Sequence, residues 1–231
     1  MKRFWKAVAV VAEEGGYSIH LDGRPVRTPA RAALLLPNET LAKAVAAEWE
    51  AVEDRIDPGT MPLTGLANAA IDQVGPDKEG FAAGLARYAE ADLACYRAEG
   101  PQPLVEWQEQ SWDALLGWGR RRFDVDFATT RSIMHVAQPA PTIERLAHAI
   151  AILEPFRLAA LSPLVTIGGS LLAALALLEL KYSTQQAWDA VTIDDRWQLE
   201  QWGLDAEAVV ALENRRQDFF AAARFLELLD A

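Results

Sequence analysis

The sequence predicts an α+β protein, with a small antiparallel β-rich N-terminal domain and a larger all-helical C-terminal domain. Two patterns support this prediction. Before residue 37, apolar and polar residues alternate with a period of two, as in half-buried strands. From Asn38 onward the apolar period is near 3.6 residues, as in amphipathic helices. We place the β-rich domain and the first helix in residues 1–60, and the helical domain in residues 61–231.

The N-terminal domain is expected to form a small sheet. Its predicted strands are residues 4–11, 17–21, 25–28 and 34–36. Residues 13–16 form the first turn, and Asp22-Gly23 supplies the positive φ angles that a tight hairpin turn requires. A sheet of this size needs another element packed on it to be stable.

The rest of the chain is expected to be helical, with Asn38 as the N-cap of the first helix. The predicted helices are 39–54, 64–74, 78–97, 104–122, 143–160, 171–181, 184–202 and 206–229. Residues 158–180 approach the roughly 20 apolar residues of a membrane span. Pro163 and the run Gly168-Gly169-Ser170 divide this segment, so a buried helix-break-helix hairpin is favoured.

Composition excludes several classes of partner. The chain has 22 basic and 33 acidic residues, a net charge of −11, which repels nucleic acid and anionic membranes and attracts basic protein surfaces. The single cysteine, Cys95, cannot form an internal disulfide and fits a reducing compartment. Glu13 and Glu14 follow the first apolar run where a signal peptide would need small residues. We therefore expect a cytoplasmic protein without membrane insertion.

Motifs for catalysis or metal binding are weak. His20, His135 and His148 are far apart in sequence, so neither a metal nor another cofactor is expected. The Gly168-Gly169-Ser170 run lacks the lysine of a phosphate-binding loop and is better interpreted as a kink between helices. Cys95 has no neighbouring histidine to act as a base. No catalytic residue is therefore assigned, and the chain is not expected to be an enzyme.

Two carboxylates stand out on helical wheels. Asp195 falls in the middle of an apolar stripe on the helix predicted at 184–202, and that stripe consists of Trp188, Val191, Leu199 and Trp202. Glu48 projects from an apolar face of the first helix, with Trp49 at its edge. A carboxylate in either place has one of two roles. It pairs with another group inside the core, or it binds a basic group on another protein. The sequence leaves both alternatives open.

Several strings resemble one family, the chaperones that assemble the catalytic head of F-type ATP synthase by holding its α subunit. In the N-terminal part they are Leu21-Asp22-Gly23-Arg24-Pro25, Arg27-Thr28-Pro29, Ala47-Glu48-Trp49, Ile56-Asp57-Pro58, Met61-Pro62-Leu63-Thr64 and Ala70-Ile71-Asp72. In the helical part they are Tyr88, Asp92, Tyr96, Arg97, Gln108, Trp112, Gly168-Gly169-Ser170, Asp194-Asp195-Arg196-Trp197-Gln198, Glu200 and Trp202-Gly203. The likeness runs nearly end to end. The departures are Gly168, where the family has serine, and Asp195, where it more often has glutamate.

The resemblance implies a non-enzymatic chaperone that binds the unassembled α subunit and shields its interface until the β subunit replaces it. The residues that we expect to bind this client are Trp49, Asp195, Glu200 and Trp202, while Glu48 and Asp92 are expected to be buried structural carboxylates. Bacterial members would work in the cytoplasm and eukaryotic ones in the mitochondrial matrix. The alternatives are a carboxylate-dependent hydrolase and a scaffold protein with a different client.

Overall fold

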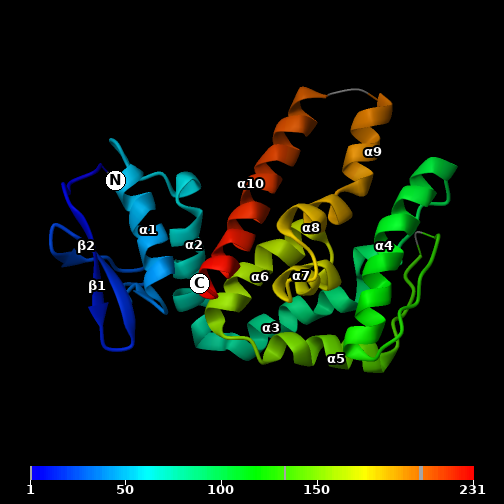
Figure 1. Cartoon of the computed structure of the whole chain (residues 1–231), viewed down its shortest axis with the longest axis horizontal. Helices are drawn as coiled ribbons and strands as arrows, with labels where there is room; N and C mark the ends of the chain where they lie inside the picture. The colour runs from blue at the N-terminus through cyan, green and yellow to red at the C-terminus, as the bar shows by residue number, and fades with distance from the viewer. Residues whose placement is uncertain (1, 133, 203–204) are drawn as a thin grey trace. The chain divides into compact units, whose positions relative to one another are not determined.

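A computed structural model describes residues 2–132, 134–202 and 205–231, and for Trp202 its backbone alone. The described strands all precede residue 37, and helices follow them (Figure 1), which confirms the predicted α+β class. Two compact units make up the chain. The first contains Met1–Lys78, Glu154–Ala160 and Ala221–Ala231, and the second contains Glu79–Leu153 and Leu161–Phe220. The first unit thus includes all of residues 1–60, and a boundary at residue 60 itself stays a prediction.

The sheet is built around one hairpin. Strands β1 (Val8–Glu13) and β2 (Gly16–Leu21) are antiparallel, with Val8 opposite Leu21. The short strands β3 (Arg24–Pro25) and β4 (Leu35–Leu36) both pair with β2. The predicted tight turn is confirmed, because Asp22 and Gly23 have φ angles of 48° and 80°.

The first strand begins later than residue 4, where it was predicted to start. The Asp22 carboxylate accepts hydrogen bonds from the backbone N–H groups of Lys6 and Ala7, at 3.1 Å and 2.9 Å. These bonds replace strand pairing at that point, so the ladder starts only at Val8. An acidic residue in the turn therefore decides where the sheet begins.

Helix α1 (Glu39–Ala51) covers the hairpin (Figure 1) and buries Leu41 and Val45 in the first unit. Its predicted N-cap is confirmed, because the Asn38 side chain accepts from Leu41 N at 2.8 Å. The Asn38 amide nitrogen also donates to Leu228 O at 2.9 Å, near the end of α10 (Ala206–Leu229). One side chain therefore starts one helix and ties down the end of another.

The break implied between the predicted helices 64–74 and 78–97, at Gly75-Pro76, is wrong. Helix α2 (Pro62–Ala69) passes through a π-turn (Ala70–Val74) and a 3₁₀ turn (Gly75–Asp77) into α3 (Lys78–Ala86). Gly75 keeps helical angles, and its N–H bonds to Ala70 O across five residues. The π-turn accommodates the proline, and the backbone stays helical from α2 to α3. The helix predicted at 78–97 instead ends in 3₁₀ turns at Arg87–Ala91 and Leu93–Cys95.

The helices that follow are α4 (Gln102–Phe123), α5 (Ala140–Ala151), α6 (Pro155–Gly168), α7 (Leu171–Leu178), α8 (Thr184–Val191) and α9 (Ile193–Trp202). Two predicted helices are thus split. The segment 143–160 breaks because Pro155 has no N–H and disfavours helical angles at Glu154. The segment 184–202 breaks at Thr192, whose N–H and hydroxyl both donate to Trp188 O.

The helix-break-helix hairpin is confirmed, although Pro163 lies inside α6 and does not divide it. The break is at Gly169, which has a φ of 65°, and Ser170 caps α7 by accepting from Ala173 N at 3.0 Å. A Cβ on Gly168 would lie 3.1 Å from the Val191 side chain, so this glycine permits close packing. Among the described helices, none has the length and hydropathy of a membrane span.

Candidate functional site

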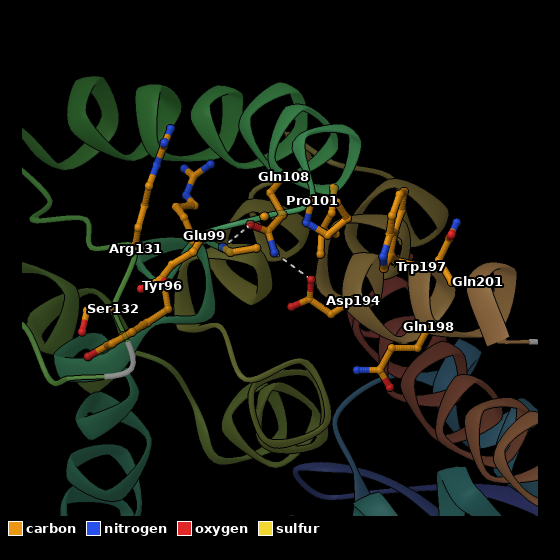
Figure 2. A pocket seen from close by; sticks show the side chains of 14 residues that line it. Tyr96, Glu99, Pro101, Gln108, Arg131, Ser132, Asp194, Trp197, Gln198 and Gln201 are labelled. Atoms are coloured by element: carbon orange, nitrogen blue, oxygen red, sulfur yellow. Dashed lines mark hydrogen bonds between the residues drawn. The ribbon is translucent and has the colours of Figure 1, made fainter.

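A groove of about 900 Å³ opens in the second unit (Figure 2). One wall is the segment 96–101 with the first turns of α4, and the other is α9, which contributes Asp194 and Trp197. Apolar contact surface comes from Pro101, Leu104 and Trp197. Such a mixture of apolar walls and a few polar groups is typical of a site that binds another molecule.

Gln108 holds the two walls together. It lies two turns into α4 and is 2% exposed. Its Oε1 accepts from Ala98 N at 2.8 Å, and its Nε2 donates to Asp194 Oδ1 at 2.7 Å. Figure 2 shows this amide between the segment 96–101 and α9, with both bonds drawn. Gln108 therefore fixes the position of the Asp194 carboxylate.

Asp194 is a half-buried carboxylate whose charge is not compensated. Burial raises its pKa, while the bond from Gln108 lowers the pKa and the negative charge of Asp195 raises it further. Within the described residues, no lysine, arginine or histidine forms an ion pair with Asp194. A cation entering the groove would supply the missing partner.

The basic groups that line the groove already have acidic partners. Arg97 Nη2 donates to Asp113 at 2.7 Å, and Arg131 Nη2 donates to Glu109 at 2.7 Å. The Arg97 side chain is 6% exposed, and its guanidinium carbon lies 5.3 Å from the centroid of the Trp112 ring. Arg97 is therefore a buried part of the wall, and neither arginine of the lining pairs with Asp194.

Asp195, which was predicted to bind the client, lies outside this lining. Its Oδ1 is 3.1 Å from Arg215 Nη1, and both side chains are about 40% exposed. The predicted stripe around Asp195 assumed one continuous helix. The structure has two helices here, α8 and α9, and on α9 Asp194 lines the groove while Asp195 pairs with Arg215.

The other two client-binding candidates of the helical unit lie near the end of α9. Glu200 is exposed. Trp202 is the last residue of α9, and its side chain lies outside the described part of the structure. Their predicted role in binding stays a prediction.

Glu48 and Trp49 belong to the first unit. The Glu48 carboxylate accepts from Leu63 N and Thr64 N, each at 2.8 Å, and from Thr64 Oγ1 at 2.7 Å. These bonds cap the first turn of α2, while burial raises the Glu48 pKa. The Trp49 ring is 9% exposed and meets the Trp5 ring edge-on, with centroids 5.4 Å apart.

Asp92 is the most buried carboxylate in the second unit, with 1% of its surface exposed. It accepts from Ala94 N at 3.1 Å, from Ser170 Oγ at 2.8 Å and from Leu172 N at 2.9 Å. Burial raises its pKa, and these hydrogen bonds oppose that shift. Asp92 thus joins the N-terminus of α7 to the chain that leads into the groove wall.

Wheel analysis missed Gln108 and Asp194, although both stand within the strings that carried the family resemblance. Their contact joins residues 86 positions apart. A polar residue among the tryptophans of α4 is the one local signal for Gln108.

In the described residues, no cluster of three or more histidine, cysteine or acidic side chains could hold a metal ion.

Comparison with known proteins identifies the class of protein. The profile of the family described as ATP12 chaperone protein matches residues 2–120, which is more than half of the chain. The chain belongs to this family, whose members are chaperones of ATP synthase assembly.

Individual relatives agree with this assignment. Atp12 from Paracoccus denitrificans has a solved structure that is 40% identical, with a TM-score of 0.93 over 98% of this chain and 97% of that one. A solved variant of the Paracoccus protein, with one aspartate replaced by lysine, is 39% identical, with the same TM-score and coverage. The mitochondrial protein atp12 of Schizosaccharomyces pombe is 25% identical, over 87% of this chain and 74% of its own length.

Proposed function

We propose that this chain binds the unassembled α subunit of F-type ATP synthase and shields its interface until the β subunit takes its place. Membership of the ATP12 chaperone family supports a role in ATP synthase assembly. The choice of the α subunit comes from the family resemblance of the sequence.

The observation that carries the proposal is the uncompensated Asp194 carboxylate in the groove between segment 96–101 and α9. A lysine or arginine of the client would pair with it, and the neighbouring apolar walls would cover aliphatic side chains. The net charge of −11 would speed the approach of a basic surface. The groove is therefore our candidate for the client-binding surface.

Release needs no catalysis in this scheme. If the α and β subunits bind each other more tightly than α binds the chaperone, mass action exchanges the partners. A hydrolase would instead be expected to place two acids with opposed pKa shifts in a deep pocket. The carboxylates that line this groove are Asp194, whose pKa is raised, and the exposed Glu99. This arrangement supports a binding role over an acid-base pair.

The client is tested by co-purification. The tagged chain is expressed with the α subunit in cells depleted of the β subunit, and the captured proteins are quantified. We expect strong enrichment of the α subunit, and adding β subunit should release it. Failure to enrich α under β depletion would remove the proposed client.

The groove is tested with two neighbouring aspartates. Asp194→Asn keeps the bond from Gln108 but removes the charge, and loss of a charged hydrogen bond of about 1.5–3 kcal/mol should weaken capture about 10- to 150-fold. Asp195→Asn is the matched control, because its exposed pair with Arg215 contributes under about 1 kcal/mol. The opposite ranking of the two variants would return the role to Asp195.

A further inference from the structure

A second, smaller pocket lies in the first unit, between α1, α2 and the loop that follows β3. Its volume is about 250 Å³, and its lining is mainly apolar, including Val26, Ile56, Pro58 and Met61. At about 30 Å³ per water molecule, it has room for about eight waters, or for one large apolar side chain. The groove between segment 96–101 and α9 shares no residue with it.

Two polar groups of this lining are buried without partners. Among the residues that the structure describes, neither the indole Nε1 of Trp49 nor the side-chain Oδ1 of Asn68 has a hydrogen-bond partner. One is a donor and the other is an acceptor. A buried group of this kind costs about 1–3 kcal/mol, so native proteins rarely leave one unsatisfied. Trp112, a buried tryptophan of the second unit, has such a partner, because its Nε1 donates to Ala190 O at 2.7 Å.

The walls of the pocket are held by contacts that are independent of any ligand. The Trp49 ring packs edge-on against Trp5, and the adjacent Glu48 binds the first turn of α2. On the other side, Thr28 Oγ1 donates to Asp72 at 2.7 Å and accepts from Ala32 N at 3.1 Å. A binding site with walls fixed in this way loses little conformational entropy when it is occupied.

We propose that this pocket receives one apolar side chain of the client protein together with the adjoining peptide group. The peptide C=O would accept from Trp49 Nε1, and the peptide N–H would donate to Asn68 Oδ1. A single peptide group supplies the acceptor and the donor that the two unpartnered atoms require. The identity of the client rests on the proposed function, whereas the chemistry of the ligand rests on the pocket.

Gly65 offers a way to fill the pocket. It lies in α2, lines the pocket and is exposed, and a Cβ placed on it would meet nothing within 4 Å. Gly65→Leu should therefore occupy the cavity without disturbing the walls, and leucine favours the helix more than glycine does. Gly84 in α3 is the matched control, because it is also exposed, helical and free of neighbours within 4 Å of an added Cβ.

The pocket is tested by NMR on the full ¹⁵N-labelled chain, with N-acetyl-leucine methylamide as the probe. We expect the indole N–H signal of Trp49 to shift with saturation, while that of Trp112 stays in place. Trp49→Phe and Asn68→Leu should each weaken binding about five-fold, as expected for one lost hydrogen bond. Gly65→Leu should abolish binding, and Gly84→Leu should bind like the wild type.

Two results would overturn the inference. One is a Trp49 indole signal that does not move at any probe concentration, and the other is unchanged binding in Gly65→Leu. If Gly65→Leu fails to fold, Asn68→Leu decides the outcome in its place. Capture of the α subunit separates this inference from the proposed function. If the wild type captures α and Gly65→Leu captures it equally well, the pocket fails alone. If the probe binds but no α is captured, the client assignment fails alone.

Discussion

Replacing Asp92 by alanine should destabilise the second unit more than any surface change. The carboxylate is 1% exposed and accepts hydrogen bonds from Ala94 N, Ser170 Oγ and Leu172 N. Alanine would leave these donors without their acceptor inside the protein. At about 1–3 kcal/mol for each unsatisfied buried group, with incomplete additivity, the expected loss is about 3–5 kcal/mol.

A competing effect reduces this loss. Burial raises the pKa of Asp92, which means that holding its charge inside the protein is costly, and removing the carboxylate relieves that cost. Asp92→Asn separates the two effects, because it removes the charge and keeps one acceptor oxygen. The NH₂ group of the asparagine would then face either Leu172 N, or the two donors Ala94 N and Ser170 Oγ, depending on the orientation of the amide. We expect Asn to cost about 1–2 kcal/mol, less than Ala.

The assay is equilibrium unfolding by denaturant and by heat. For a chain of 231 residues, about 3–5 kcal/mol corresponds to a fall in melting temperature of about 6–20 °C. Asp195→Asn is the control, with an expected loss under about 1 kcal/mol. If Asp92→Ala costs less than 1 kcal/mol, or if Asn costs more than Ala, the hydrogen-bond argument is refuted.

Three further predictions concern the groove and its surroundings. Because burial raises the folded-state pKa of Asp194, its contribution to stability is complete below the ordinary carboxyl pKa and is lost as the pH rises through the raised value. Asp194→Asn should therefore melt no lower than the wild type at pH 7 while capturing less α subunit, and a lower melting temperature would assign Asp194 to the fold. Gln108→Leu leaves Ala98 N and Asp194 unpaired, so denaturant unfolding should show a loss of about 1–3 kcal/mol, and an unchanged midpoint would contradict its bridging role. Burial raises the pKa of the Cys95 thiol to about 12, so iodoacetamide at pH 8 should label Cys95 only after denaturation, as mass spectrometry can check.

Local sequence signals predicted the features that depend on neighbouring residues. Asn38 caps α1 because its side chain reaches a backbone N–H three residues ahead, and the turn at Asp22-Gly23 depends on residues that tolerate positive φ. The kink at Gly169 belongs to the same group. In each case the energetic preference lies within a few residues, so tertiary packing does not need to be known.

The breaks that were placed wrongly have a different cause. Apolar periodicity continues across Pro155 and Thr192, so a wheel that relies on period alone runs through both. Pro155 is visible in the sequence, and its effect on Glu154 could have been predicted. Thr192 could not, because its hydroxyl bonds to the backbone of Trp188 in competition with a continued helix. On α9, which follows this break, Asp194 lines the groove and Asp195 does not.

The sequence by itself determined the α+β class, the hairpin, the helical second part and, through its motifs, the chaperone family. These properties depend on periodicity, turn chemistry and composition, which can be read from the sequence without the structure. Only the tertiary structure decided which polar groups meet. Gln108 reaches Asp194 across 86 positions. Trp49 Nε1 and Asn68 Oδ1 belong to one pocket lining and have no hydrogen-bond partner among the described residues. Hydrogen bonding and desolvation act between atoms in space, so the burial and pairing of a side chain follow from packing and not from its local sequence.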